Sequence, residues 1–470
     1  MHIRPLRPLR PVICGWVALL FAAAFAIPDA AHGHIEVETS SPDRDEVLFA
    51  PPPHIRILFS GRIEARYTSL TLTAPDGSEV RIGDVVFIGD SDREITALLP
   101  ALERTGSYTV RWRTAGADGH VLEGSFVFVL ASDSARAAPS ESSDTMASAG
   151  AEQRAAAHDD HAEHDAPRTV GGAADSIGRG LHFGALLLLL GAVSFRALLM
   201  PRLALTDVTR AVLQRRTWRM AAAAALLLGA AAVVRLWFQS AALHGAERAW
   251  NTQLLSIMLT DTGWGRAWML QAFLFALLGM AIVWARPQRD RAALFAAVAA
   301  VLGLSAIPGL SGHAAAANGV LSLAVVSDAV HVAAAGAWLG TLAMLMLVAL
   351  PAIMKLESDG ESAAADAVDR FSPIALTGGA VVLLSGLVNA FMHLSTPGQL
   401  WTTGYGRVLA VKVLLVALVA AAGIINWRKV RPELRHAGGA RRLRLSAGME
   451  LTFALFVLIT TAVLTGQPRP

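Results

Sequence analysis

Cysteine is almost absent from this chain: its 470 residues include a single one, Cys14. That residue lies in an N-terminal segment, residues 1–33, which we expect to be removed as a signal peptide. The mature protein then has no disulfide and no thiolate metal site. Any metal site in it has to use other ligands.

Charge is also scarce. Charged residues make up 16% of the chain against 54% hydrophobic residues, and the formal net charge is only +3. This composition is too apolar for an ordinary soluble protein and indicates no nucleic-acid partner. The motif G-x-x-x-x-G-K-[ST] is missing, which argues against a P-loop ATPase. Since no nucleophile or acid–base constellation stands out, we expect a protein that is not an enzyme.

The N-terminus follows the pattern of a cleaved secretory signal. Three arginines precede an apolar run over residues 16–27, and Ala31 and Gly33 supply small residues before the expected cleavage site. Cleavage after Gly33 leaves His34 with a free amine beside its imidazole, and Cu(II) favours such ligands in a tetragonal plane. Cleavage after Ala31 is the alternative, and it would expose His32-Gly33-His34, which also suits Cu(II).

Short alternating runs fill residues 34–130. Examples are residues 54–59, 108–112 and 126–129, and turn signals separate them. This pattern predicts an all-β domain, a Greek-key-like sandwich or barrel. Near its end, Asp118 and His120 are two residues apart and so project from the same face of an extended segment. A carboxylate and an imidazole placed in this way would complete a Cu(II) site begun by the N-terminal histidine.

The order of these features resembles the CopC family of periplasmic copper-binding proteins. The features are the N-terminal histidine, Thr39-Ser40-Ser41-Pro42, Pro51-Pro52-Pro53, Trp112-Arg113, Asp118-Gly119-His120 and Gly124-Ser125-Phe126. The resemblance covers the whole domain and implies that His34, Asp118 and His120 are the Cu(II) ligands. Family members with a methionine-rich Cu(I) site also exist. No methionine occurs between residues 34 and 130, so we expect a Cu(II)-only domain.

Residues 131–172 are rich in Ala, Ser and Asp, which predicts a flexible linker. Within it, residues 158–165 contain three histidines among carboxylates. This stretch has two interpretations: it binds copper or zinc weakly, or it is a solvated linker without a metal.

From residue 173 to residue 470 the chain is a series of long apolar runs, and eight of them have spanning length. They cover roughly residues 176–199, 218–241, 264–285, 291–310, 322–350, 372–393, 407–427 and 447–466. Basic residues gather after the first, third and seventh runs, so the positive-inside rule places these loops in the cytoplasm. We therefore expect an all-α, multi-pass domain in the bacterial inner membrane, with the N-terminal domain and the C-terminus in the periplasm.

The eight runs fall into two similar sets of four. The matched pairs are Thr262-Gly263-Trp264-Gly265-Arg266 with Thr403-Gly404-Tyr405-Gly406-Arg407, His182 with His331, Gly191 with Gly340, and His244 with His393. The last three pairs share an offset of 149 residues. An even number of spans per copy makes the copies parallel, which predicts a 4+4 repeat about a pseudo-twofold axis along the membrane normal.

Five histidines fall in the outer half of the predicted membrane domain or at its outer edge: His182, His244, His313, His331 and His393. Ionisable residues inside a bilayer are costly and by default point to function, so these are candidate metal ligands. A hydrogen bond between helices is the alternative interpretation for any one of them. Asp328, one turn before His331, is a candidate to orient that imidazole.

The membrane part resembles the CopD family of copper-resistance proteins. The features that carry the resemblance are Ser311-Gly312-His313-Ala314, His331 with Trp338-Leu339-Gly340, Arg370-Phe371-Ser372-Pro373, Tyr405-Gly406-Arg407 with Lys412, and Glu450-Leu451. The resemblance covers most of residues 176–467. With the first domain it implies a fused CopC–CopD chain, an arrangement associated with copper uptake across the inner membrane and copper tolerance.

We therefore expect capture of Cu(II) in the periplasm and transfer to the membrane domain for import, homeostasis and resistance. Copper ions, the lipid bilayer and periplasmic copper chaperones are the expected partners, and copper inside the membrane is either Cu(II) or Cu(I). Two alternatives remain. One is a b-type haem protein with His182 and His331 as iron ligands. The other is a copper sensor or scaffold without transport.

Overall fold

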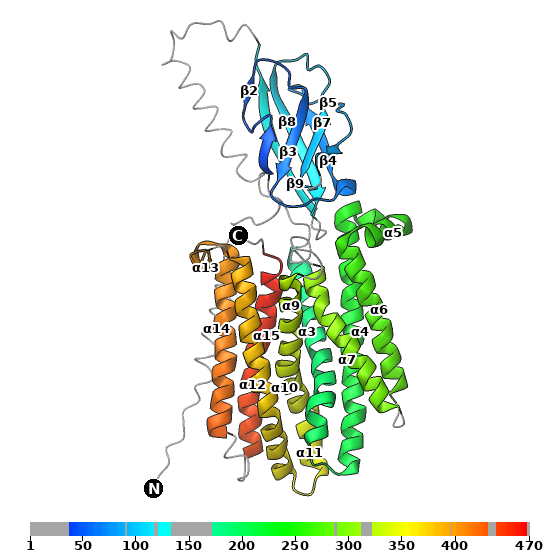
Figure 1. Cartoon of the computed structure of the whole chain (residues 1–470), viewed down its shortest axis with the longest axis vertical. Helices are drawn as coiled ribbons and strands as arrows, with labels where there is room; N and C mark the ends of the chain where they lie inside the picture. Colours follow the sequence, from blue (N-terminus) through cyan, green and yellow to red (C-terminus); the bar gives the residue numbers. More distant parts are fainter. Residues whose placement is uncertain are drawn as a thin grey trace. The chain divides into compact units, whose positions relative to one another are not determined.

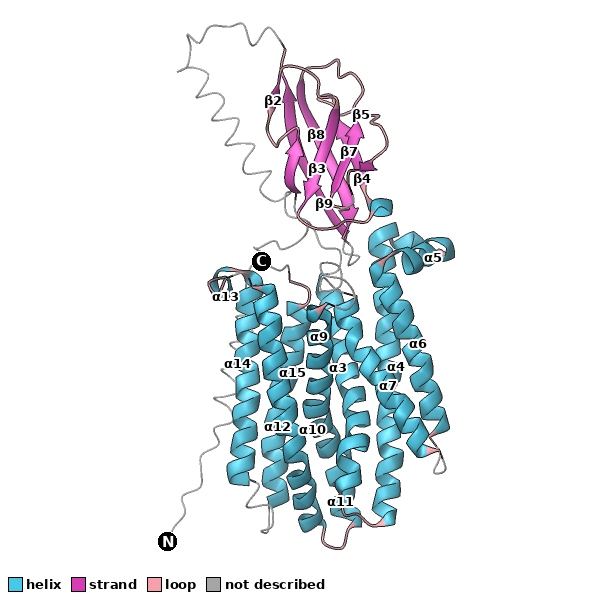
Figure 2. Ribbon diagram, viewed as in Figure 1, coloured by secondary structure: helices cyan, strands magenta, loops and turns pink. Residues whose placement is uncertain are grey.

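The computed structural model describes residues 37–89, 92–116, 121–132, 172–285, 289–311, 322–394, 396–430 and 439–467. The chain divides into two compact units (Figure 1). One consists of His34–Gly172 and Phe238–Gly265, and the other, which we call the helical unit, contains Ala173–Trp237 and Arg266–Pro470. The described strands all belong to the first of these units, which we call the β unit (Figure 2).

The β unit is a sandwich of two sheets. Its strands are β1 (Val37–Ser41), β2 (Val47–Leu48), β3 (His54–Phe59), β4 (Ser69–Thr73), β5 (Glu79–Val80), β6 (Val86–Phe87), β7 (Glu94–Leu98), β8 (Gly106–Ala115) and β9 (Val121–Leu130). One sheet has the order β1-β3-β7-β6 and the other β2-β9-β8-β4-β5. Buried residues alternate along β3 and β7 and along much of β8, as expected for strands with one face on a core. The predicted all-β fold is confirmed.

Phe59 and Trp112 connect the two sheets. Their rings meet edge to face, with centroids 5.3 Å apart. Trp112 on β8 pairs with Gly124 on β9. A Cβ atom at Gly124 would lie 2.4 Å from the indole ring, so the glycine provides the space that the indole occupies. Trp112 and Gly124 both belong to the motifs noted in the sequence.

The predicted eight apolar spans are confirmed as long helices or helix series. The long helices are α3 (Gly172–Ser194), α4 (Asp207–His244), α6 (Gly263–Trp284), α7 (Asp290–Leu310), α9 (Leu323–Ala335), α12 (Gly360–His393), α14 (Gly404–Ile425) and α15 (Gly439–Leu464). Shorter segments are α5 (Thr252–Asp261), α10 (Thr341–Met344), α11 (Leu350–Leu356), α13 (Gln399–Thr402) and the π-helices η3 (Phe195–Leu199), η6 (Gly336–Gly340), η7 (Leu345–Ala349) and η8 (Asn426–Val430). Helices α4 and α12 begin well before the apolar runs predicted for them, because each helix continues into a polar stretch.

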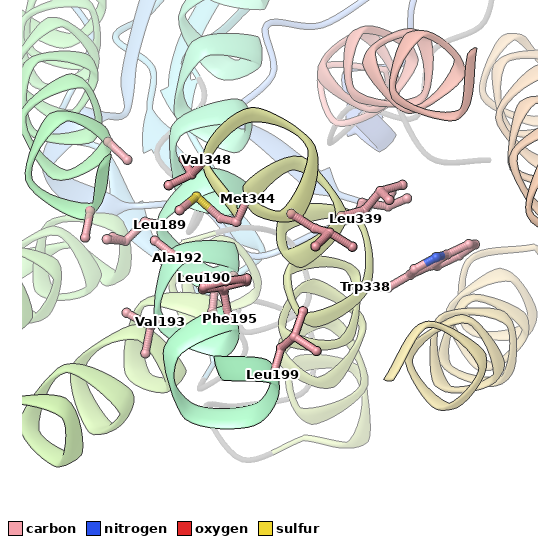
Figure 3. Close-up of a cluster of buried hydrophobic side chains, with 14 of the residues drawn as sticks. Leu189, Leu190, Ala192, Val193, Phe195, Leu199, Trp338, Leu339, Met344 and Val348 are labelled. Carbon is pink, nitrogen blue, oxygen red and sulfur yellow. The ribbon is translucent and has the colours of Figure 1, made fainter. Parts of the chain in front are cut away.

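The two copies of the repeat touch at Gly191 and Gly340. A Cβ atom on Gly191 would lie 2.2 Å from the carbonyl carbon of Gly340, and one on Gly340 would lie 2.7 Å from Cα of Gly191. Two equivalent residues in mutual contact have to lie beside the axis that relates the copies, which supports the predicted pseudo-twofold arrangement. Apolar side chains of α3, η3 and the helix series that follows α9 surround this crossing (Figure 3).

The first turns of α6 and α14 have the same capping hydrogen bonds. The Thr262 hydroxyl accepts a hydrogen bond from the Gly265 amide at 2.9 Å, and the Thr403 hydroxyl accepts one from the Gly406 amide at 3.0 Å. Each hydroxyl also donates to a carbonyl one turn earlier, that of Met258 or Gln399, at 2.8 and 2.7 Å. These residues correspond at a constant offset of 141.

The register between the copies changes by one residue within the fifth span. The offset is 149 at His182 and Gly191 but 150 at Pro201, whose counterpart is Pro351. The π-helices η3 and η7 already correspond at the offset of 150. The additional residue of the second copy therefore lies between Gly340 and Leu345.

Candidate metal site

The three residues predicted to bind Cu(II) lie outside the described residues. His34 comes three residues before β1, and Asp118 and His120 fall between β8 and β9. What the structure describes is the framework around them. The β8–β9 hairpin is regular up to the pair Ala115 and Val121, which directly flanks this stretch.

The described framework brings the start of β1 close to the end of β8. Val37 pairs with Phe59, and Ile63 forms a bridge with Gly116. The chain from Phe59 to Ile63 spans at most about 14 Å when fully extended. The start of β1 and the end of β8, which adjoin the predicted ligands in the sequence, therefore lie at the same end of the sandwich.

The five membrane histidines are placed differently. His182 on α3 is only 2% exposed, and its Nδ1 atom has no hydrogen-bond partner. His244 and His393 end α4 and α12, where Nδ1 of His244 lies 3.3 Å from the Ser240 hydroxyl and the His393 ring meets Tyr405 edge on. His313 lies outside the described residues. Within the part of the chain that the structure describes, no three His, Cys, Asp or Glu side chains gather as a metal site.

His331 instead joins a polar cluster between α9 and α12. The cluster consists of Ser327, Asp328 and His331 on α9 and Ser385 and Asn389 on α12. Nδ1 of His331 lies 3.1 Å from the Ser385 hydroxyl, and the Asn389 amide donates to Asp328 at 2.6 Å. The Ser327 hydroxyl donates to the Ser385 carbonyl at 3.3 Å. We call these five residues the His331 cluster.

The hydrogen bonds of Ser385 favour one tautomer of His331. The Ser385 hydroxyl donates its one proton to the Val381 carbonyl at 2.6 Å, so toward His331 it acts as an acceptor. This arrangement favours the tautomer in which Nδ1 of His331 carries the ring proton and Nε2 keeps its lone pair. A neutral imidazole with an available Nε2 is the form that binds a metal ion.

Two charged groups accompany this ring. The Lys412 ammonium on α14 interacts electrostatically with the Asp328 carboxylate and with His331. Gly309 on α7 approaches Asp328 closely, since a Cβ there would lie 3.3 Å from Cβ of Asp328. The cluster thus combines an imidazole nitrogen, a carboxylate and a nearby cation inside the helical unit.

Ser385 and Asn389 were not predicted from the sequence. Asp328 was the candidate to orient His331, whereas the hydrogen bond described for Nδ1 is with Ser385. A signal was present, because the two polar residues are four apart in an apolar run and so share one face of α12. The pairing of α12 with α9 was needed to connect them with His331.

Three known families match the chain in succession. Residues 37–131 match the CopC domain, residues 173–323 match the copper resistance protein D-like N-terminal domain, and residues 365–464 match copper resistance protein D. The second match ends at the start of α9, so it corresponds to the first copy of the repeat.

Single proteins are also similar to parts or most of the chain. The copper transport protein CutJ of Bacillus subtilis (strain 168) is 27% identical over 461 residues, which are 97% of this chain and 78% of that protein. The solved structure of CopC from Methylosinus trichosporium OB3b is 30% identical, with a TM-score of 0.20, covering 21% of this chain and 96% of that one. PcoC, a methionine-rich copper resistance protein from Escherichia coli, is 24% identical, with a TM-score of 0.19, covering 21% and 99%.

The family matches and the fold agree. The β sandwich coincides with the CopC match. The two copper resistance protein D matches fall on the helical unit and on residues 238–265, which belong to the same compact unit as the β sandwich. Eight apolar helices within and between those matches make the helical unit a multi-pass membrane domain. The chain therefore combines a CopC domain and a copper resistance protein D-like membrane domain in one polypeptide.

Proposed function

We propose that this protein captures Cu(II) outside the membrane and passes copper to the His331 cluster for import into the cell. The observation that carries the membrane step is the hydrogen bond between Nδ1 of His331 and Ser385, which leaves Nε2 for a metal, with the Asp328 carboxylate one turn earlier on the same helix. Transport as the outcome is supported by the relative named a copper transport protein. The role is binding and transfer rather than catalysis.

The capture site consists of the His34 amine and imidazole, the Asp118 carboxylate and the His120 imidazole. Nitrogen and oxygen ligands of this kind suit Cu(II). The described framework supports the assignment, because β1 and β8 flank the three residues at one end of the sandwich. Periplasmic copper chaperones would deliver the ion to this end.

The membrane step requires compensation for a buried cation, because a bare charge inside a bilayer is costly. Asp328 offers a full negative charge and Nε2 of His331 offers a ligand atom, so both requirements are met within the same cluster. The arginine-rich loops after the first, third and seventh spans support an orientation in which the capture unit is periplasmic.

Replacing His120 by alanine tests the capture step. We expect the Cu(II) affinity of the purified full-length protein to fall by at least about tenfold. Loss of a metal ligand should reduce the affinity at least as much as loss of a group that only orients a ligand. Cu(II) EPR would lose the nitrogen-rich tetragonal signal, and cells would take up less radioactive copper when copper is limiting. N-terminal sequencing is the companion measurement: a mature chain that starts anywhere but His34 rules out the amine ligand.

Replacing Ser385 by alanine tests the tautomer. Without an acceptor for its Nδ1 proton, the His331 ring no longer presents Nε2 in a fixed form, and copper affinity at the membrane site should fall roughly 10- to 100-fold. The measurement is competition against a copper chelator, with the outer site silenced by His120→Ala. Ser372→Ala is the control, because Ser372 is on the same helix and donates only to the Val368 carbonyl. Equal affinities in the two variants would contradict the proposed role of Ser385.

A further inference from the structure

Glu450 is a buried carboxyl group that the proposed copper site does not use. It lies on α15 and is only 5% exposed. The eighth apolar span begins at Leu445, so Glu450 is five residues inside it, or about 8 Å along the helix axis. Ionisable side chains inside a membrane domain are costly, and in transporters buried acids often carry protons. A function is therefore expected for this carboxyl.

Asn426 and Ser446 hold the carboxyl in place. The Asn426 amide donates a hydrogen bond to Oε1 of Glu450, and the Ser446 hydroxyl donates one to Oδ1 of Asn426. Gly423, one turn before Asn426, faces the same carboxyl oxygen, since a Cβ there would lie 3.8 Å from it. Asn426 also begins the π-helix η8, a feature frequent at functional sites. We call Asn426, Ser446 and Glu450 the Glu450 cluster.

No cation compensates this carboxyl among the described residues, whose ion pairs do not include Glu450. The elements α10, α12, α14 and η8 pack against α15. Their titratable residues are Glu361, Asp366, Asp369, Arg370, His393, Arg407, Lys412, Arg428 and Lys429. Of these, Asp366 and Arg370 pair with each other at 3.1 Å, and Arg428 is exposed. A carboxylate buried without a cation is costly, so the neutral acid is the expected form.

The first copy of the repeat has no such cluster. The helices α7 and α15 end in the matching motifs Leu310-Ser311-Gly312 and Leu464-Thr465-Gly466, at an offset of 154, and the first turns of α6 and α14 have an offset of 141. At these offsets the counterparts of Glu450, Ser446 and Asn426 are all alanines, namely Ala296, Ala292 and Ala285. The three polar residues therefore occur together, in the copy that also contains the His331 cluster.

The two clusters of the second copy lie at different depths. Helix α15 packs against α12, which carries Ser385, and the ends of these two helices meet at Tyr405, whose ring contacts His393 and packs with Leu464. Counted from these ends, Ser385 lies at about 12 Å and Glu450 at about 21 Å along the helix axis. Glu450 is thus on the order of 10 Å deeper than the His331 cluster, toward the arginine-rich loops.

We propose that Glu450 is a proton-binding site of the membrane domain, which holds a proton when copper is absent and releases it when copper enters the domain. The inference rests on the proposed function. The O–H bond of the acid breaks, the proton passes to water at the nearer end of the span, and the carboxylate that remains compensates the positive charge of copper. The proton returns when copper has left.

Replacing Glu450 by glutamine tests this proposal, because the amide keeps the shape of the acid but has no proton to release. At an effective dielectric of about 20, a unit charge on the order of 10 Å away changes a binding constant by roughly tenfold. In liposomes that contain the full-length protein, we expect Glu450→Gln to take up copper about tenfold more slowly than the parent in alkaline buffer. In acidic buffer the two rates should converge, because the parent carboxyl then keeps its proton.

Infrared spectroscopy gives a readout that does not depend on transport. The copper-free protein should show the C=O stretch of a protonated carboxyl, and addition of Cu(I) or Cu(II) should remove it. Glu450→Gln should lack this band, and Glu450→Asp should show it at a shifted frequency. Glu247→Gln is the control, since it makes the same change on an exposed side chain and should keep both the band and the parent's uptake.

The outcomes separate the two proposals. If Glu450→Gln elutes from gel filtration like the parent and keeps the band, or keeps the parent's uptake in alkaline buffer, the proton role is wrong. If that variant fails to fold, Glu450→Asp decides, and an unshifted band overturns the proposal. A Glu450 band that copper leaves unchanged overturns it as well. Uptake that survives His331→Ala unchanged would instead overturn the proposed function, while the band of the copper-free protein would remain.

Discussion

Replacing His331 by glutamine is expected to reduce copper uptake through the membrane domain to the level of cells that lack the protein. The reason is that Nε2 of this ring is the nitrogen that the Ser385 hydrogen bonds leave available to the metal. A glutamine retains polarity and approximate size but offers an amide, which is a weaker ligand for copper than a neutral imidazole. The measurement is accumulation of radioactive copper in intact cells at matched protein levels.

His182→Gln is the matched control. It makes the same chemical change at the equivalent position of the first copy, where the ring has no hydrogen bond at Nδ1 and the counterpart of Asp328 is an arginine. We expect uptake to be retained to a much larger extent in this variant. Equal losses in the two variants would show that both copies bind copper, and unchanged uptake in His331→Gln would contradict transport through the His331 cluster.

The same pair of variants addresses the haem alternative. A b-type haem ligated by both rings would give a Soret band that either substitution removes. Our proposal predicts that the purified protein has no Soret band. It also predicts that copper uptake depends on His331 far more than on His182.

Much of the architecture follows from patterns that act over short distances. Alternation with a period of two predicted the strands, since one face of each strand has to meet a core. Apolar runs of spanning length predicted the eight membrane helices. The repeat was visible because Gly191 and Gly340 share the offset of His182 and His331, and the contact between these glycines supports it.

The His331 cluster was less accessible to sequence analysis because it depends on which helix faces meet. Asp328 was assigned to His331 because the two are close in sequence, yet its described hydrogen bond goes to Asn389, sixty-one residues away. Nothing local in α12 says that Ser385 faces α9.

Replacing Gly191 by alanine is expected to destabilise the membrane domain severely. The new Cβ would lie 2.2 Å from the Gly340 carbonyl carbon, and backbone on both sides of the crossing cannot move aside as a flexible side chain can. Overpacking of this kind costs about 1–3 kcal/mol or more, and close backbone contact is a main source of helix association in membranes. Thermal unfolding of the full chain, followed by fluorescence-detected gel filtration, measures the loss.

Gly184→Ala on the same helix is the control, because a Cβ there would meet no atom within 4 Å. An alanine is also a better helix former than glycine, so this variant should unfold at the parent temperature or slightly above it. Gly340→Ala should reproduce the loss seen for Gly191→Ala, since the two residues face each other beside the pseudo-twofold axis. If Gly191→Ala unfolds like Gly184→Ala, the two copies do not cross at these glycines.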